Sequence, residues 1–264
     1  MIIQFRKNLS MLKMKDKELF GSETAKDGFR NEEEVIVKFN NWKKDKIAQE
    51  WLVIMGYVLN NIEYVKAVKI TGNYKTDVQV QVTIKLKEAI DCENLSIKLA
   101  SNPRGFNQID KREIEKYVKM WRIPKDIEEI LKLFTGKKTP QKTKGLNDAR
   151  RMLLTEMPKK DQLRIINFFD KNKILIISDI LKGREKFTAD WMLVILKKDE
   201  QSYEWALKDI NVVMNIFGQG DVRITEQGSL KIGQIGMQRK GGDGGRESAK
   251  MLQFKINPCL LFKS

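Results

Sequence analysis

The strongest constraint on the fold is a run of alternating apolar and polar residues between positions 65 and 101. Three stretches, VKAVKITG, DVQVQVTIKL and NLSIKLAS, are rich in β-branched residues, and turn-like breaks separate them at Gly72–Asn73 and around Asp91–Asn94. A period of two places successive side chains on opposite faces of a strand. The segment therefore predicts three consecutive strands of a meandering sheet.

Helical spacing of apolar residues surrounds these strands. It predicts helices at 31–43, 45–57, 109–121, 124–135, 146–157 and 160–172. The last third predicts strands at 173–181, 189–198, 221–226, 229–240 and 251–256, with a short helix near 209–217 and a Gly-rich loop at 241–248. The order of helices, sheet, helices and sheet predicts an α/β or α+β fold with two sheet-centred lobes.

Composition narrows the function through what is missing. The chain has no histidine, which excludes histidine triads and imidazole metal sites. Its two cysteines, Cys92 and Cys259, form no disulfide framework, and no apolar run reaches the roughly 20 residues of a membrane span. The first 13 residues lack a secretory pattern, and Met14 could also serve as a start. We therefore expect a cytoplasmic protein whose chemistry uses carboxylates, lysine, hydroxyls or a hard metal ion.

Charge indicates the partner. A formal net charge of +15 favours a polyanion, and nucleic acid above all, over a membrane surface or no charged partner.

One constellation could carry chemistry. Asp77 begins one predicted strand, and Ser96, Ile97 and Lys98 lie on the next, with 18 residues (78–95) between Asp77 and Ser96. Paired strands would bring Asp77 beside Lys98, while Ser96 and Lys98 share a face and Ile97 points to the core. A metal-dependent phosphodiester hydrolase needs such an arrangement, with an aspartate oxygen on a hard cation and a lysine near the attacking water. By itself this pattern is weak, because exposed aspartates and lysines are common at the ends of strands.

Four strings make the constellation more specific. They are GSETAKDGFRNEEE at 21–34, YKTDVQV at 74–80, SIKLASNPRGFNQID at 96–110 and QRKGGDGGRESAKMLQFKINP at 238–258. Together they resemble the monomeric type II restriction endonucleases that cut at GCGC, in order from about Met14 to the C-terminus. That resemblance implies a PD-(D/E)xK core, with a mixed sheet flanked by helices at 14–135 and a helical connector and DNA-recognition lobe at 136–264. A single intertwined domain stays open as an alternative.

The resemblance also assigns roles. In that family an aspartate is followed after eighteen residues by Gln-x-Lys, so Asp77 would bind Mg²⁺ together with the Ile97 backbone carbonyl, and Lys98 would be the motif lysine. Ser96 departs from the pattern, because it replaces the amide or acid. It would reach the metal through water, or it would be a strand residue that faces solvent. Glu32 could supply a further acid, or it could only complement the dipole of its helix.

Two segments could read DNA. In RGFNQ, expected to open a helix, Arg104 could contact guanine or phosphate, and Asn107 and Gln108 could pair with base edges. We expect Phe106 in the core rather than as a stacking wedge. In QRKGGDGGR, the candidates for reading a site of only G and C are Gln238, Arg239, Lys240 and Asp243. A capped turn and a solvated hairpin loop are the structural alternatives.

These expectations combine into a monomer that cleaves both strands of duplex DNA at GCGC with Mg²⁺. Its functional partner in a restriction-modification system would be a cognate DNA methyltransferase. The alternatives are a DNA-binding protein that lost its chemistry through Ser96, and a repair nuclease that shares only the core.

Overall fold

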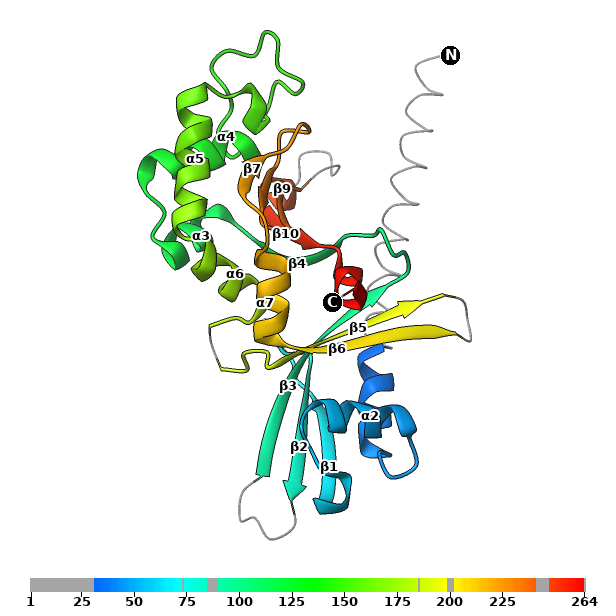
Figure 1. Cartoon of the computed structure of the whole chain (residues 1–264). Helices are drawn as coiled ribbons and strands as arrows, with labels where there is room; N and C mark the ends of the chain where they lie inside the picture. The colour runs from blue at the N-terminus through cyan, green and yellow to red at the C-terminus, as the bar shows by residue number, and fades with distance from the viewer. Residues whose placement is uncertain are drawn as a thin grey trace.

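A computed structural model of the chain describes residues 31–72, 74–84, 90–184, 186–198, 202–240 and 247–263. Its strands form two five-stranded sheets, and helices pack beside both of them (Figure 1). The expected α+β fold, with a mixed sheet flanked by helices and a second strand-rich lobe, is confirmed.

The first sheet has the strand order β1-β2-β3-β5-β6. It contains β1 (Ile62–Lys69), β2 (Val78–Ile84), β3 (Ile90–Ala100), β5 (Trp191–Lys197) and β6 (Tyr203–Asp209). β3 runs parallel to β5, and all other neighbours are antiparallel. The three predicted strands β1 to β3 are confirmed as a meander, although Asp91–Asn94 lies inside β3 rather than at a break.

The second sheet is antiparallel throughout and has the order β4-β10-β9-β8-β7. It contains β4 (Asn107–Arg112), β7 (Val222–Ile224), β8 (Leu230–Ile232), β9 (Ile235–Arg239) and β10 (Leu252–Ile256). β4 comes from the first half of the chain, whereas β5 and β6 of the first sheet come from the second half. The division into 14–135 and 136–264 stays a prediction.

Residues 31–40 are helical, as predicted. The other helices are α2 (Lys46–Ile54), α3 (Ile114–Trp121), α4 (Lys125–Thr135), α5 (Lys159–Lys171), α6 (Lys173–Leu181) and α7 (Ile210–Gly218). Short 3-10 helices lie at η1 (Leu59–Asn61), η2 (Leu154–Glu156), η3 (Glu247–Lys250) and η4 (Pro258–Lys263). Among the described residues no helix is long and apolar enough to cross a membrane.

One face of the first sheet is buried against helices, and the central part of β5 is buried on both faces. Val78, Val80 and Ile97 point to one face and pack with residues of the 31–40 helix and α2. Met192 and Val194 point to the other face and join the larger core built from α3 to α7 and the second sheet. The hydrophobic cores of the two lobes therefore lie on opposite faces of this sheet, and both include residues of β5.

The predicted strand at 173–181 is wrong, because this segment forms α6. Its isoleucines favour a strand locally, but Ile176, Ile177 and Ile180 are buried at helical spacing while Ile174 is 87% exposed. A short apolar run does not distinguish the two structures, and here packing against the neighbouring α7 decided for the helix.

Four other predictions need correction. The predicted helix at 109–121 begins only at Ile114, because 107–112 forms β4 and pairs with β10. The predicted helix at 146–157 contains only η2, since its backbone bonds elsewhere, for example from Leu154 N–H to the Gly228 carbonyl at 2.9 Å. The predicted strand at 229–240 is the hairpin β8–β9. Strand β6 was missed, although the alternation of Tyr203, Trp205 and Leu207 could have revealed it.

Candidate active site

Asp77 and Lys98 meet where the start of β2 lies beside β3. Val78 lies opposite Leu95, so Asp77 stands one position before the paired strand, and its N–H donates to the Leu95 carbonyl at 2.8 Å. The Ile97 N–H donates to Asp77 Oδ2 at 2.6 Å, and Lys98 Nζ lies 3.3 Å from the same oxygen. The expected convergence of the two side chains is therefore present, on the sheet face opposite α2.

The oxygens at this site suit a hard cation. Lys98 Nζ lies between Asp77 Oδ2, at 3.3 Å, and the Ile97 carbonyl oxygen, at 2.9 Å. The ammonium thus occupies the place of a cation between the two oxygens that were expected to bind the metal. Among the described residues, Asp77 Oδ1 has no hydrogen-bond partner, and no cluster of three or more Asp, Glu, Cys or His side chains forms a metal site. A metal here would complete its shell with water and substrate phosphate, as Mg²⁺ commonly does.

Ser96 does not face solvent, so that interpretation is wrong. The residue is 2% exposed, and its hydroxyl donates to Asp77 Oδ2 at 3.4 Å. It lies in register with Met192 of β5. The hydroxyl is thus a close neighbour of the carboxylate, on a side chain shorter than the amide or acid of the family pattern.

Glu32 is engaged with a partner other than Asp77 or Lys98. Its carboxylate forms an ion pair with Lys69 at 2.8 Å. Lys69 ends β1 opposite Val78, the residue that follows Asp77. A role for Glu32 at the metal stays a prediction.

Sequence analysis missed the residues that anchor the segment before Asp77. Lys75 Nζ lies 2.6 Å from Asp110 Oδ2 of β4 and donates to the Ile109 carbonyl at 3.0 Å. Arg112 and the Tyr117 hydroxyl also donate to Asp110. Although burial would raise the pKa of Asp110, the Lys75 charge and these hydrogen bonds hold it below its usual value. No local pattern reveals this pair, because Lys75 lies in the segment before β2 of the first sheet and Asp110 lies on β4 of the second.

The loop after β3 differs from its prediction. Asn107 and Gln108 do not open a helix but belong to β4, where Asn107 donates to the Leu99 carbonyl at 2.7 Å and Gln108 pairs with Lys255. Arg104 is exposed. Phe106 is not in the core: it is 61% exposed. The loop therefore presents an aromatic ring and a guanidinium to solvent just beyond the strand that carries Lys98.

The second predicted reading segment is described only in part. Gln238 and Arg239 end β9, whereas Asp243 lies outside the described residues. The Arg239 guanidinium lies 5.9 Å from the centroid of Phe134, and burial together with the nearby Arg151 charge lowers its pKa. Its Nη1 is buried without a hydrogen-bond partner among the described residues.

Arg151 Nη1 donates to the carbonyl of Lys240, the residue after β9, at 2.8 Å. This hydrogen bond links β9 to the segment between α4 and η2. Base contacts by Gln238, Arg239, Lys240 and Asp243 stay predictions.

Comparison with known proteins identifies the family. The profile of the R.HinP1I restriction endonuclease family matches residues 55–262. The crystal structure of restriction endonuclease MspI in complex with its cognate DNA is similar, with a TM-score of 0.58 and 15% sequence identity over 83% of this chain and 80% of that chain. At this identity the likeness shows the fold alone. No curated relative matches the sequence. Because the family profile spans most of the chain and includes Asp77 and Lys98, the protein belongs to the R.HinP1I restriction endonuclease family and is a DNA-cleaving hydrolase.

Proposed function

We propose that the protein is a Mg²⁺-dependent type II restriction endonuclease of the PD-(D/E)xK superfamily. In this proposal it hydrolyses both strands of duplex DNA at a short GC-rich palindrome, GCGC. The observation that carries it is the convergence of the Asp77 carboxylate, the Ile97 carbonyl and the Lys98 ammonium where the start of β2 lies beside β3.

Each group has a defined task in this proposal. Asp77 and the Ile97 carbonyl would hold the cation, and Ser96, whose hydroxyl contacts Asp77, would reach it through water. A bound Mg²⁺ would neutralise charge on the scissile phosphate and make its water more acidic. Lys98 holds the attacking water by hydrogen bonds and balances the charge that develops on the phosphate oxygens. Glu32 is the proposed further acid.

Base reading is proposed for the two segments that were expected to contact DNA. Arg104, Gln108, Gln238, Arg239 and Lys240 carry donors for base edges or phosphate. The carboxylate of Asp243 suits the cytosine amino group, while Asn107 reaches DNA only if it releases the Leu99 carbonyl. GCGC follows from family likeness. The protein would act as a monomer in the cytoplasm, beside a methyltransferase that protects the same site.

Digestion of a sequenced plasmid tests the proposal. Wild-type protein with Mg²⁺ should produce discrete fragments whose mapped ends fall at GCGC and carry 5′-phosphates. EDTA should abolish them, and Lys98→Ala should bind the site without cutting it. Wild-type rates from Lys98→Ala would show that the active site lies elsewhere.

The same digest separates the alternative that Ser96 suggests. Ser96 replaces a metal-ligating side chain, so a protein that retains the fold but only binds DNA has a specific observation in its favour. Such a protein would shift the mobility of DNA and leave the plasmid intact. Fragments without a common sequence, or nicks at junctions, would instead indicate a repair nuclease.

A further inference from the structure

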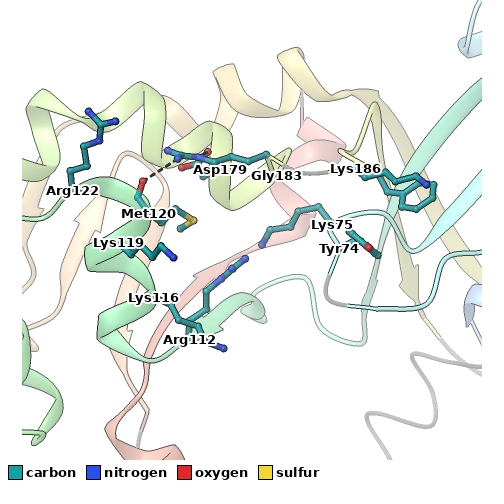
Figure 2. Close-up of a pocket in the computed structure, with 12 residues that line it drawn as sticks. Tyr74, Lys75, Arg112, Lys116, Lys119, Met120, Arg122, Asp179, Gly183 and Lys186 are labelled. Carbon is teal, nitrogen blue, oxygen red and sulfur yellow. Dashed lines mark hydrogen bonds and ion pairs between the residues drawn. The ribbon is translucent and has the colours of Figure 1, made fainter.

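A strongly basic cavity lies beside the candidate active site. Its volume is about 530 Å³, and its lining combines seven lysine and arginine side chains with a single carboxylate, that of Asp179. Figure 2 shows the cavity between α3, the end of α6 and the segment before β2, with Lys75 and Lys119 directed toward one another from opposite walls.

Most of this charge has no acidic partner. Asp110 pairs with Lys75 and Arg112, and Asp179 pairs with Arg184 at 2.5 Å. The other lining cations form no ion pair with a described carboxylate. They are Lys116, Lys119, Arg122 and Lys186. Four like charges around one cavity repel one another, so the cavity is electrostatically prepared for an anion.

Helix-end electrostatics explains only part of this cluster. Lys119 lies in the last turn of α3, where a cation complements the helix dipole. Arg122, however, caps α3 with a left-handed backbone (φ 52°), a conformation that favours glycine. Lys116 lies in the first turn of α3, where the helix dipole disfavours a cation. A requirement for positive charge in the cavity accounts for all three residues.

The cavity adjoins the segment before β2 that bears Asp77. Lys75 lines it and lies two residues before Asp77, and the intervening Thr76 donates through its hydroxyl to the Phe187 carbonyl at 2.7 Å. The rings of Tyr74 and Phe187 contact edge to face with centroids 5.2 Å apart. An anion in the cavity is therefore held in a fixed relation to the catalytic edge.

We propose that this cavity binds backbone phosphates of the DNA substrate on one side of the scissile phosphodiester, through Lys116, Lys119 and Arg122. The inference rests on the proposed function and adds to it a contact that reads no sequence. Lysine meets phosphate as a point charge, and such contacts set the register and affinity of a complex without specifying bases.

The test compares two variants that lose the same charge. The first is Lys116→Gln/Lys119→Gln in α3. The control is Lys160→Gln/Lys171→Gln in α5, whose lysines are exposed and lie outside the cavity. DNA affinity is measured in EDTA, so that no cleavage occurs, at several salt concentrations. The cavity variant should bind long duplexes about tenfold more weakly, and the slope of its salt dependence should fall by about 2. The control should retain the wild-type slope.

Duplex length then locates the contact. On a duplex that ends at the recognition site, the cavity variant and wild type should bind alike, because the flanking phosphates are absent. Uncharged methylphosphonates at the flanking positions should weaken wild type and leave the cavity variant unchanged. Equal salt slopes for the two variants, or an equal loss on short and long duplexes, would overturn the proposal.

Free phosphate is the other source of this chemistry. If millimolar inorganic phosphate raised the melting temperature of wild type but not of the cavity variant, while both bound DNA equally, the cavity would be a small-anion site and the proposal would be wrong. Failure remains separable from failure of the proposed function. If wild type does not cleave the plasmid, the nuclease proposal fails. If wild type cleaves the plasmid but the cavity variant has the same salt slope as wild type, only the cavity proposal fails.

Discussion

Asp77 and Asp110 are the same chemical group in opposite circumstances. Asp110 has a side chain 5% exposed and is bonded to Lys75, Arg112 and Tyr117. Asp77 has a side chain 25% exposed, and the contacts that its carboxylate makes with described residues all fall on Oδ2. Each lies near a lysine. Both oxygens of Asp110 are hydrogen-bonded within the protein, whereas Asp77 keeps one oxygen available for a ligand.

The difference separates a structural carboxylate from the one proposed to bind the metal. A buried charge remains ionised only when the protein satisfies it, and Asp110 meets that condition. Asp77 accepts a hydrogen bond from the Ile97 N–H, and its other carboxylate oxygen has no partner among the described residues, which suits the proposed metal ligand. Variants of the two residues should therefore fail in different ways.

The largest effect should come from Asp77→Asn. Asparagine can still accept the Ile97 hydrogen bond, so folding should be nearly unchanged. Loss of the anionic ligand should lower the cleavage rate at least about a thousandfold, since several kcal/mol of transition-state stabilisation depend on the cation. Single-turnover cleavage and thermal unfolding are measured together. A variant that cuts normally, or one that unfolds, would end the contrast with Asp110.

Asp110→Asn should show the converse. It leaves Lys75 buried without its anionic partner, so the free energy of unfolding should fall by about 3–5 kcal/mol. Denaturant titration measures this. The control is Asp126→Asn on the exposed side of α4, which should change stability by less than about 0.5 kcal/mol. Equal losses from both variants would make Asp110 an ordinary surface acid.

The effect of Ser96→Ala should be smaller. The hydroxyl is 3.4 Å from Asp77 Oδ2, a weak contact, so we expect the cleavage rate to fall less than about tenfold. Single-turnover rates over a range of Mg²⁺ concentrations separate weaker metal affinity from slower chemistry. A loss as large as that of Asp77→Asn would mean that Ser96 binds the metal directly.

The pH dependence should give the smallest effect. The pKa of Asp110 is lowered in the folded protein, so its ionisation stabilises the fold above its unfolded pKa of about 3.9. This stabilisation is lost as the pH falls through the folded-state pKa. The stability gap between wild type and Asp110→Asn should therefore be widest above about pH 4 and should narrow in more acidic solution. A gap independent of pH would show that the ion pair does not carry it.

Several elements show how much local sequence patterns predict on their own. The alternation in DVQVQVTIKL and NLSIKLAS was enough to place β2 and β3 and to bring Asp77 to Lys98. The same reasoning failed for α6, where isoleucine-rich sequence suits either structure, and for Phe106, whose apolar ring suggested a core that the loop does not reach.

Adjacent strands and helical spacing are local properties, so the order of residues in the chain was sufficient to predict the meander, most helices and the approach of Asp77 to Lys98. Only the tertiary structure decided the Lys75–Asp110 pair and the basic cavity. It also decided that β4 joins the second sheet and that β5 and β6 join the first. These features depend on contacts between residues far apart in the sequence. Their energy comes from burial and charge pairing that no local pattern records.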